Sequence, residues 1–213
     1  MIESRLAKII LLDGSQLDFH ITPEILTSNL LDMVASYLTL KDKEYFGISY
    51  MDSTCHRNWL QLDKKVLNHD LPKKSNILIF FFRVKFYIES IAFTKDKMAV
   101  ELFYLQAKFS IVQNEIEISQ EILYELTALV LQSIYGDFKS ESETVNNLKG
   151  QSILPKSFLV STINSAQKVI SYYRKCVSMN RGQCIVNYLS IIEKLCNYGV
   201  HYYEVKDKSN IKW

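Results

Sequence analysis

Two long apolar runs at helical spacing fill the stretch from Val100 to Phe138, and they constrain the fold more than any other part of the chain. The first helix is expected over Met98 to Gln113, with apolar residues on more than one side, which predicts burial from several directions. The second is expected to begin at Ser119 or Gln120 and to end at Gly136, a left-handed cap. The apolar positions are Val100, Leu102, Phe103, Leu105, Ala107, Phe109 and Val112 in the first helix and Ile122, Leu126, Leu129, Val130 and Ile134 in the second.

Two more helices are predicted further along, which makes a four-helix unit. They span Asn164 to Val177 and Gly182 to Leu195, and Asn180 stands where the last helix needs a cap. Ile185, Leu189 and Ile192 form the inward stripe of that helix. The polar segment Lys139 to Gly150 is interpreted as a loop, with a short helix as the alternative. After Gly199, Tyr202 to Val205 is expected to be extended.

The first 84 residues have a different pattern, one that alternates between strands and a single helix. Asp13-Gly14 is a strong hairpin signal between two strands over Arg5 to Ile21, because glycine tolerates positive φ. A helix follows, capped by Thr27 or Ser28, with Leu30, Leu31, Val34, Ala35 and Leu38 on one face. The remaining strands are predicted over Tyr45 to Tyr50, Asn58 to Leu62 and Ile77 to Val84, the last of them central.

Composition excludes several classes of protein. The 213 residues are 48% hydrophobic with a net charge of +2, so nothing in the overall charge favours nucleic acid as a partner. No apolar run approaches the ~20 residues needed to cross a bilayer, and no secretory signal stands at the start, so we expect an intracellular, soluble chain. The cysteines Cys55, Cys176, Cys184 and Cys196 match no zinc spacing and are expected to be reduced and mostly packed.

The resemblance to a known family rests on five motifs in order. LFYLQAK (Leu102 to Lys108) and LQSIYGDF (Leu131 to Phe138) resemble the first two bundle helices of FERM domains. LPK (Leu154 to Lys156) resembles a loop marker of that family. YLSIIEKLCNYGVHYYEVKDK (Tyr188 to Lys208) resembles the last bundle helix running into the third lobe. WLQLDKKV (Trp59 to Val66) resembles the tryptophan strand of the first lobe.

The resemblance implies an α+β protein: a ubiquitin-like β-grasp lobe over residues 1–84, an acyl-CoA-binding-protein-like four-helix lobe over 85–197, and the first strand of a truncated third lobe over 198–213. The sequence is most similar to the FERM domain-containing protein 4 subgroup of junction and polarity scaffolds. That similarity implies a non-enzymatic adaptor with cytohesin-type exchange factors among its partners, at the cytoplasmic face of the plasma membrane, cell junctions or the cytoskeleton. Cytoskeletal linkers and FERM-containing tyrosine phosphatases are the competing family members.

A basic cluster is the first candidate site. In membrane-binding members of the family, the lysine pair at the positions of Lys64 and Lys65 contacts a phosphoinositide headgroup, and each cation near an anionic leaflet contributes about 1 kcal/mol. Lys73, Lys74 and Arg57 stand nearby in the sequence. This chain departs from the family at two positions, where Thr54 and Gln61 replace lysines. The alternative is an ordinary solvated lysine face.

Other candidates are weighed against packing roles. Tyr172 and Tyr173 are candidate partner contacts or core residues, since aromatic side chains are common at interface hot spots. An acyl chain or acyl-CoA could occupy the helical lobe, but Phe103, Tyr104 and Phe109 are expected in its core instead. Cys55-His56 is interpreted as a surface turn. No motif supports a catalytic residue, a metal ligand or a cofactor, so no enzyme activity is expected.

Overall fold

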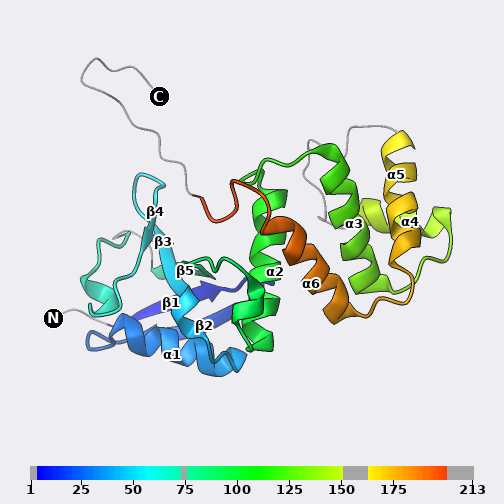
Figure 1. Ribbon diagram of the computed structural model, residues 1–213. Coiled ribbons are helices and arrows are strands. Elements are labelled where there is room, and N and C mark those ends of the chain that lie inside the picture. The colour runs from blue at the N-terminus through cyan, green and yellow to red at the C-terminus, as the bar shows by residue number, and fades with distance from the viewer. Residues whose placement is uncertain (1–3, 73–75, 151–162, 201–213) are drawn as a thin grey trace, which may run out of the picture.

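A five-stranded mixed sheet with one long helix is followed by a group of helices (Figure 1). The computed structural model describes residues 4–72, 76–150 and 163–200. We call the sheet with its helix the sheet unit; its elements are β1 (Arg5–Ile10), β2 (Gln16–Ile21), α1 (Thr27–Leu38), β3 (Phe46–Met51), β4 (Arg57–Trp59) and β5 (Ile77–Val84). We call the rest the helical unit; it contains α2 (Lys97–Val112), α3 (Gln120–Tyr135), α4 (Glu141–Gly150), α5 (Ile163–Tyr173) and α6 (Arg181–Ile192).

The sheet has the order β2-β1-β5-β3-β4, so β5 is central as predicted. β1 pairs antiparallel with β2 across the Asp13-Gly14 turn and parallel with β5, while β3 pairs antiparallel with both β4 and β5. Gly14 has φ +86°, which explains why glycine is needed there. This mixed sheet wrapped on α1 confirms the predicted β-grasp arrangement.

The start of α1 differs from the prediction, and so does the end of β4. Leu26, not Thr27 or Ser28, is the N-cap residue, and its side chain makes no capping hydrogen bond. The backbone N–H of Thr27 instead donates to the carbonyl of Lys64 (3.0 Å), and that of Ser28 donates to the carbonyl of Leu62 (3.1 Å). Because the chain turns toward α1 to accept these bonds, β4 ends at Trp59 rather than continuing to Leu62.

The helical unit follows its predicted boundaries closely. Asn180 caps α6 in a reciprocal capping box with Gln183, and Ser119 caps α3. Gly136 ends α3 with φ +74° but ψ −152°, so its conformation is open to glycine without being the predicted left-handed helical one. Ile134 was expected on the buried stripe of α3 and is 43% exposed instead.

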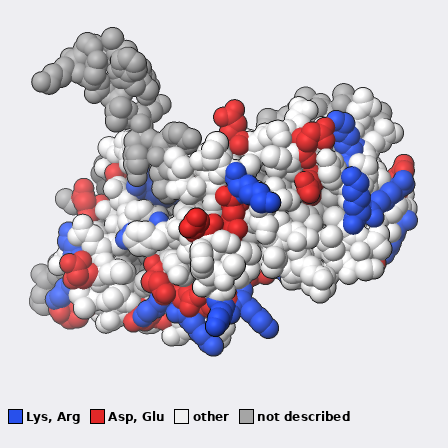
Figure 2. All heavy atoms as spheres, viewed as in Figure 1, with Lys and Arg blue, Asp and Glu red and all other residues white. Residues whose placement is uncertain are grey.

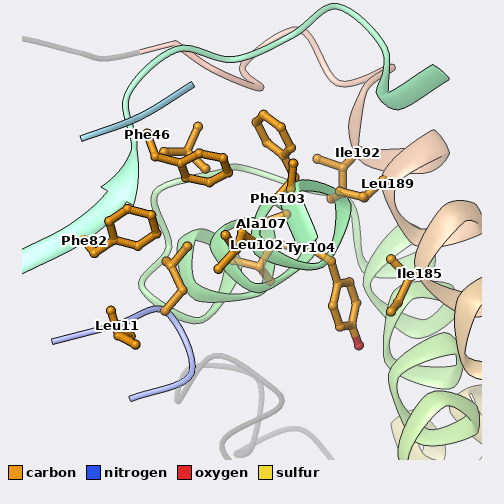
Figure 3. Packing of buried hydrophobic residues seen from close by; sticks show 14 of the residues in the cluster. Leu11, Phe46, Phe82, Leu102, Phe103, Tyr104, Ala107, Ile185, Leu189 and Ile192 are labelled. Atoms are coloured by element: carbon orange, nitrogen blue, oxygen red, sulfur yellow. The ribbon is translucent and has the colours of Figure 1, made fainter. Parts of the chain in front are cut away.

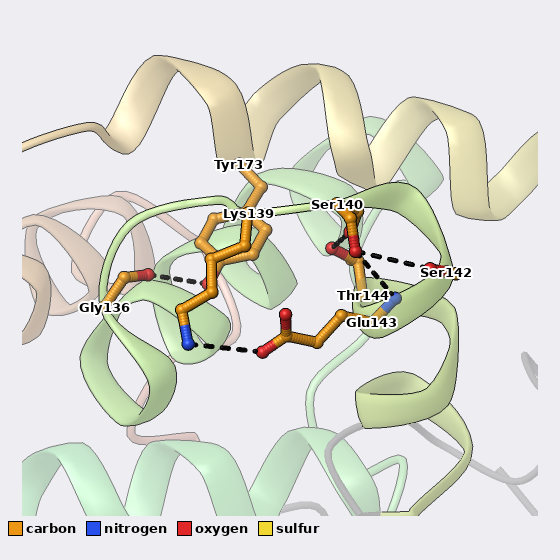
Figure 4. Close-up of polar contacts among 7 residues, drawn as sticks. All are labelled: Gly136, Lys139, Ser140, Ser142, Glu143, Thr144 and Tyr173. Atoms are coloured by element: carbon orange, nitrogen blue, oxygen red, sulfur yellow. Dashed lines mark hydrogen bonds and ion pairs between the residues drawn. The ribbon is translucent and has the colours of Figure 1, made fainter.

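The segment Lys139 to Gly150 contains the helix α4, which was only the alternative in the sequence prediction. Its first turn is held by Ser140, whose hydroxyl accepts from the backbone N–H of Glu143 (3.3 Å; Figure 4). Thr144 is buried, and its hydroxyl donates to the carbonyl of Ser140 (2.8 Å). The tertiary contacts of a few buried side chains thus stabilise a helix whose sequence is mostly polar.

The two units share one continuous buried cluster at their junction (Figure 3). Phe103 of α2 has no exposed surface and packs against Tyr45 and Phe46, with ring centroids 5.9 and 5.5 Å apart. Phe46 stacks in turn on Phe82 of β5 at 5.4 Å. The next residue of α2, Tyr104, lies edge-on to Tyr188 of α6 at 5.0 Å. Helix α2 therefore belongs to the cores of both units.

Within the described ranges, no helix is both long enough and apolar enough to cross a bilayer. Two expectations lie outside the described residues: the loop marker Leu154 to Lys156, and the extended segment Tyr202 to Val205 that was assigned to a third lobe.

Candidate functional site

The lysine pair lies on the exposed turn that is bound to the start of α1. The Lys64 side chain is exposed, and its carbonyl accepts from both the backbone and the hydroxyl of Thr27 (each 3.0 Å). The ammonium of Lys65 forms an ion pair with Glu24 (2.5 Å). Two backbone bonds therefore fix the position of the turn, while Glu24 neutralises one of its two cations.

The other members of the predicted basic cluster do not join this turn in the described structure. Lys73 and Lys74 lie outside the described residues. Arg57 pairs with Met51 at the beginning of β4 and lines a separate cavity at the junction of the two units. On the face that Figure 2 shows, acidic and basic side chains are interspersed rather than gathered into one field.

The cavity that Arg57 lines, which we call the junction cavity, has a volume of about 770 Å³. It lies between the sheet unit and the C-terminal part of α2, and residues after α6 close one side. Its walls are mixed in character. Apolar surface comes from Met51, Trp59, Val84 and Ile116, and polar groups come from Arg57, Arg83, Ser110 and Glu115.

Arg83 is the most unusual side chain in this cavity, because it is an arginine that is only 5% exposed. Its Nη1 donates to the carbonyls of Phe82 (2.8 Å) and Ile10 (3.3 Å). Its guanidinium carbon lies 5.4 Å from the ring centroid of Phe81 and 4.9 Å from that of Phe109. Among the described residues, its Nε–H has no hydrogen-bond partner.

The electrostatics of Arg83 reflect this crowded position. The pKa of Arg83 is lowered to about 10, chiefly by burial and next by the positive charge of Arg57, while Glu115 acts in the opposite direction. The hydroxyl of Ser110 donates to Glu115 (2.8 Å), which fixes that carboxylate at the cavity. Within the described part of the chain, the cavity lining therefore contains two guanidinium groups and one carboxylate.

A second polar contact, at Asp96, joins the two units on another side. One carboxylate oxygen of Asp96 accepts from the backbone N–H groups of Lys41 (2.6 Å) and Asp42 (3.1 Å), which follow α1. The other oxygen caps α2 by accepting from Met98 N–H (2.9 Å). Burial alone would raise the pKa of Asp96, but its hydrogen bonds from the backbone of Lys41, Asp42, Met98 and Ala99 together lower it.

The two candidate tyrosines have different environments. Tyr173 is 3% exposed, and its hydroxyl donates to the carbonyl of Gly136 (2.6 Å; Figure 4). It is therefore a core residue, which was one of its two predicted roles. Tyr172 is half-buried and lines an open groove of about 350 Å³. Its hydroxyl donates to Glu121 (3.3 Å), and the ammonium of Lys175 lies 4.7 Å from its ring centroid. Of the pair, only Tyr172 can meet a partner in this conformation.

The remaining sequence candidates have structural explanations. Cys55 and His56 lie in the exposed β3–β4 turn, where Asp52 accepts backbone bonds from Thr54 and His56 (each 2.9 Å). Cys176 and Cys184 are buried, whereas Cys55 and Cys196 are exposed, so only half of the thiols are packed. Within the described part of the chain, no three side chains of His, Cys, Asp or Glu gather in the way a metal ion requires.

Comparison with known protein families identifies both units of the chain. Residues 9–71 match the FERM N-terminal domain, and residues 89–203 match the FERM central domain. The chain belongs to the FERM family. The two matches correspond to the sheet unit and the helical unit, so the sequence resemblance is confirmed at the level of the family.

Solved structures of FERM proteins are similar over nearly the whole chain. The FERM and C-terminal domain complex of Drosophila Merlin matches with a TM-score of 0.84 and 26% identity, over 98% of this chain and 71% of that one. The MyTH4-FERM MF2 domain of Dictyostelium discoideum myosin VII has a TM-score of 0.75 at 16% identity. The human myosin 7b MyTH4-FERM domain, solved with the harmonin-a PDZ3 domain, has 0.73 at 18%. Each of these two matches covers 98% of this chain but only 45% of the myosin chain. At these identities the two myosins support the fold alone.

Sequence reasoning did not single out Arg83 or Asp96 as functional candidates. A signal for Arg83 was present, because it is the one charged residue in the strand ILIFFFRV that was predicted to be central. A charge inside a buried strand requires partners and often marks a site. Asp96 carries no comparable signal, since its contacts with Lys41 and Asp42 bridge more than fifty positions of the chain.

Proposed function

We propose that this chain is the two-lobe part of a FERM scaffold that binds other proteins at the cytoplasmic face of a membrane and catalyses no reaction. The observation that carries the proposal is the match of both units to the FERM family. Two of the similar structures are themselves complexes: Merlin with its C-terminal domain, and myosin 7b with a PDZ domain of harmonin-a. Protein binding is therefore the activity that these relatives favour for the chain.

The finer assignment is also a proposal. We infer lobes at residues 1–84 and 85–197 and the beginning of a third lobe at 198–213, together with a place in the FERM domain-containing protein 4 subgroup. The motifs around Trp59 and Leu102 support that subgroup. It implies cytohesin-type exchange factors as partners and a position at cell junctions or the cortical cytoskeleton. A pull-down with a purified cytohesin tests this directly, and absence of binding at micromolar concentration contradicts the subgroup.

A membrane contact through the lysine turn is the second part of the proposal. Lys64 and Lys65 project from a turn that two backbone bonds hold in place. Each cation near an anionic leaflet contributes about 1 kcal/mol, so removing both is expected to weaken binding about thirtyfold. Because Lys65 is already paired with Glu24, it is expected to contribute less to the free energy of membrane binding than Lys64 does.

The test is co-sedimentation with vesicles that contain phosphatidylinositol 4,5-bisphosphate. The double variant Lys64→Glu/Lys65→Glu should lose binding. The matched control Lys149→Glu/Lys194→Glu makes the same change in net charge at two exposed lysines of the helical unit. Equal losses in the two variants would mean that net charge alone matters, and unchanged binding in the first would remove the lysine turn from the proposal.

A further inference from the structure

The junction cavity contains more positive than negative charge in a partly desolvated space. Among the described residues that line it, Arg57 and Arg83 contribute two positive charges and Glu115 contributes one negative charge, which leaves an excess of one. Arg57 lies close enough to Arg83 for its positive charge to lower the pKa of Arg83. Charges that are removed from water are stabilised when an opposite charge pairs with them. The cavity is therefore suited to a further anionic group.

We propose that the junction cavity receives one carboxylate side chain from an acidic segment of a partner protein, held between Arg57 and Arg83. This inference rests on the protein-binding role proposed above and names a site for it. It differs in place and in chemistry from the lysine turn, because neither Lys64 nor Lys65 lines this cavity.

The charge balance favours a carboxylate over a phosphate. A single carboxylate brings one negative charge, which the excess in the cavity neutralises. A phosphate monoester brings about −1.5 to −2 and would leave an uncompensated negative charge beside Glu115. Guanidinium groups form bidentate hydrogen bonds with carboxylates and phosphates alike, so the balance of charge is what distinguishes the two.

The walls of the cavity favour a peptide as the carrier of that carboxylate. Trp59, Val84 and Ile116 provide apolar surface beside the two arginines. A volume of about 770 Å³ lies within the range of about 300–1,000 Å³ typical of ligand sites, and it accommodates more than one side chain. An acidic residue flanked by apolar residues therefore fits both the charge and the apolar surface.

The two arginines differ in how firmly they are held. Arg83 is fixed by the carbonyls of Phe82 and Ile10 and lies between two aromatic rings, so its position costs little further entropy on binding. Arg57 is exposed on the short strand β4, at the edge of the sheet. Arg83 would thus provide a preorganised cation, and Arg57 would close over the bound carboxylate.

The experiment uses isothermal titration calorimetry on the full 213-residue chain. The probe is an acetylated and amidated heptapeptide with glutamate at its centre and leucine on both sides, and the comparison peptide has glutamine in place of glutamate. We expect saturable binding of the glutamate peptide and at least about tenfold weaker binding of the glutamine peptide, because the charge-assisted bonds are lost. The indole N–H resonance of Trp59, distinguished from Trp213 by Trp213→Phe, should shift during the same titration.

Two variants test the assignment, and they are expected to change the affinity for the glutamate peptide in opposite directions. Arg57→Gln should weaken binding of the glutamate peptide about tenfold, because one of the two cations is removed. Glu115→Gln should strengthen it several-fold, because it removes the competing carboxylate and keeps an acceptor for Ser110. The matched control Lys139→Gln, at an exposed position in the helical unit, should change neither value.

Three results would overturn the inference: no saturable binding of the glutamate peptide, equal affinity for both peptides, or weaker binding in Glu115→Gln. Tight binding of a phosphoserine peptide without binding of the glutamate peptide would assign the cavity to phosphate instead. Vesicle binding and the cytohesin pull-down are separate readouts of the proposed function. If they persist while the peptide fails, only the junction cavity is wrong.

Discussion

Replacement of Asp96 by alanine is the most direct test of how the two units are joined. The carboxylate makes two kinds of contact at once: one oxygen caps α2 through Met98 N–H, and the other accepts from Lys41 and Asp42 in the sheet unit. Loss of a helix N-cap costs about 1 kcal/mol. Hydrogen bonds to a charged group contribute about 1.5–3 kcal/mol each, but partial exposure lets water replace part of that. We therefore expect Asp96→Ala to lower the free energy of unfolding by about 2–4 kcal/mol.

Asparagine at this position separates the two contacts. Its single carbonyl oxygen can accept either the helix cap or the sheet-unit bonds, and its NH₂ group cannot accept at all. Asp96→Asn is therefore expected to lose about half of the alanine effect. Ser119→Ala is the matched control, because Ser119 caps α3 within the helical unit alone and should cost about 0.5–1 kcal/mol.

Equilibrium unfolding in guanidinium chloride measures all three variants against the unmodified chain. Far-UV circular dichroism follows the helices, and intrinsic fluorescence, measured with Trp213→Phe in every variant, follows Trp59 in the sheet unit. If Asp96→Ala costs no more than Ser119→Ala, the contact between the units contributes nothing and the reasoning fails.

The same carboxylate predicts a dependence of stability on pH. The pKa of Asp96 in the folded state is below its ordinary value of 3.8. Its contribution is therefore fully present above pH 4 and is lost as pH falls through the lower pKa of the folded state, because the unfolded chain binds the proton first. Asp96→Asn should show a smaller decrease in the free energy of unfolding below pH 4 than the unmodified chain.

Two further pairs of substitutions test the core and the end of the helical unit by thermal denaturation. Phe103→Ala removes a ring with no exposed surface and should cost about 3–5 kcal/mol, whereas Phe93→Ala, at a residue that is 72% exposed, should stay within about 0.5 kcal/mol. Gly199→Ala should lower the free energy of unfolding more than Gly14→Ala does. Both glycines have positive φ, which costs a side chain about 1–2 kcal/mol, but only at Gly199 would a Cβ lie 3.0 Å from the side chain of Tyr87. Equal losses within either pair would contradict the packing described here.

The elements that were predicted correctly are those whose conformation is determined by residues close together in the sequence. The Asp13-Gly14 hairpin, the helix cap at Asn180 and the strand Ile77–Val84 were all predicted from neighbouring residues, and the structure confirms each. In these cases the residues that determine the conformation lie within a few positions of one another. Sequence pattern alone was therefore sufficient.

Several of the predictions that were wrong concern contacts between distant segments. Thr27 has the chemistry of a helix cap, but its hydroxyl donates to Lys64, 37 positions away, so Leu26 precedes the helix instead. Arg83 and Asp96 likewise acquire their roles from segments more than fifty positions distant. No local pattern records such pairings, and the candidate site at the junction could not be derived before the two units were placed together.

The junction cavity and the stability of the fold depend on the same helix. Along α2, Phe103 packs into the sheet unit and the adjacent Tyr104 packs against α6, while Ser110 and Phe109 at its other end contact the groups that form the cavity. A displacement of the units relative to each other would therefore move Phe109 away from Arg83. Because the buried cluster resists that displacement, the guanidinium of Arg83 keeps its place at the cavity before any partner arrives, and binding does not have to order it.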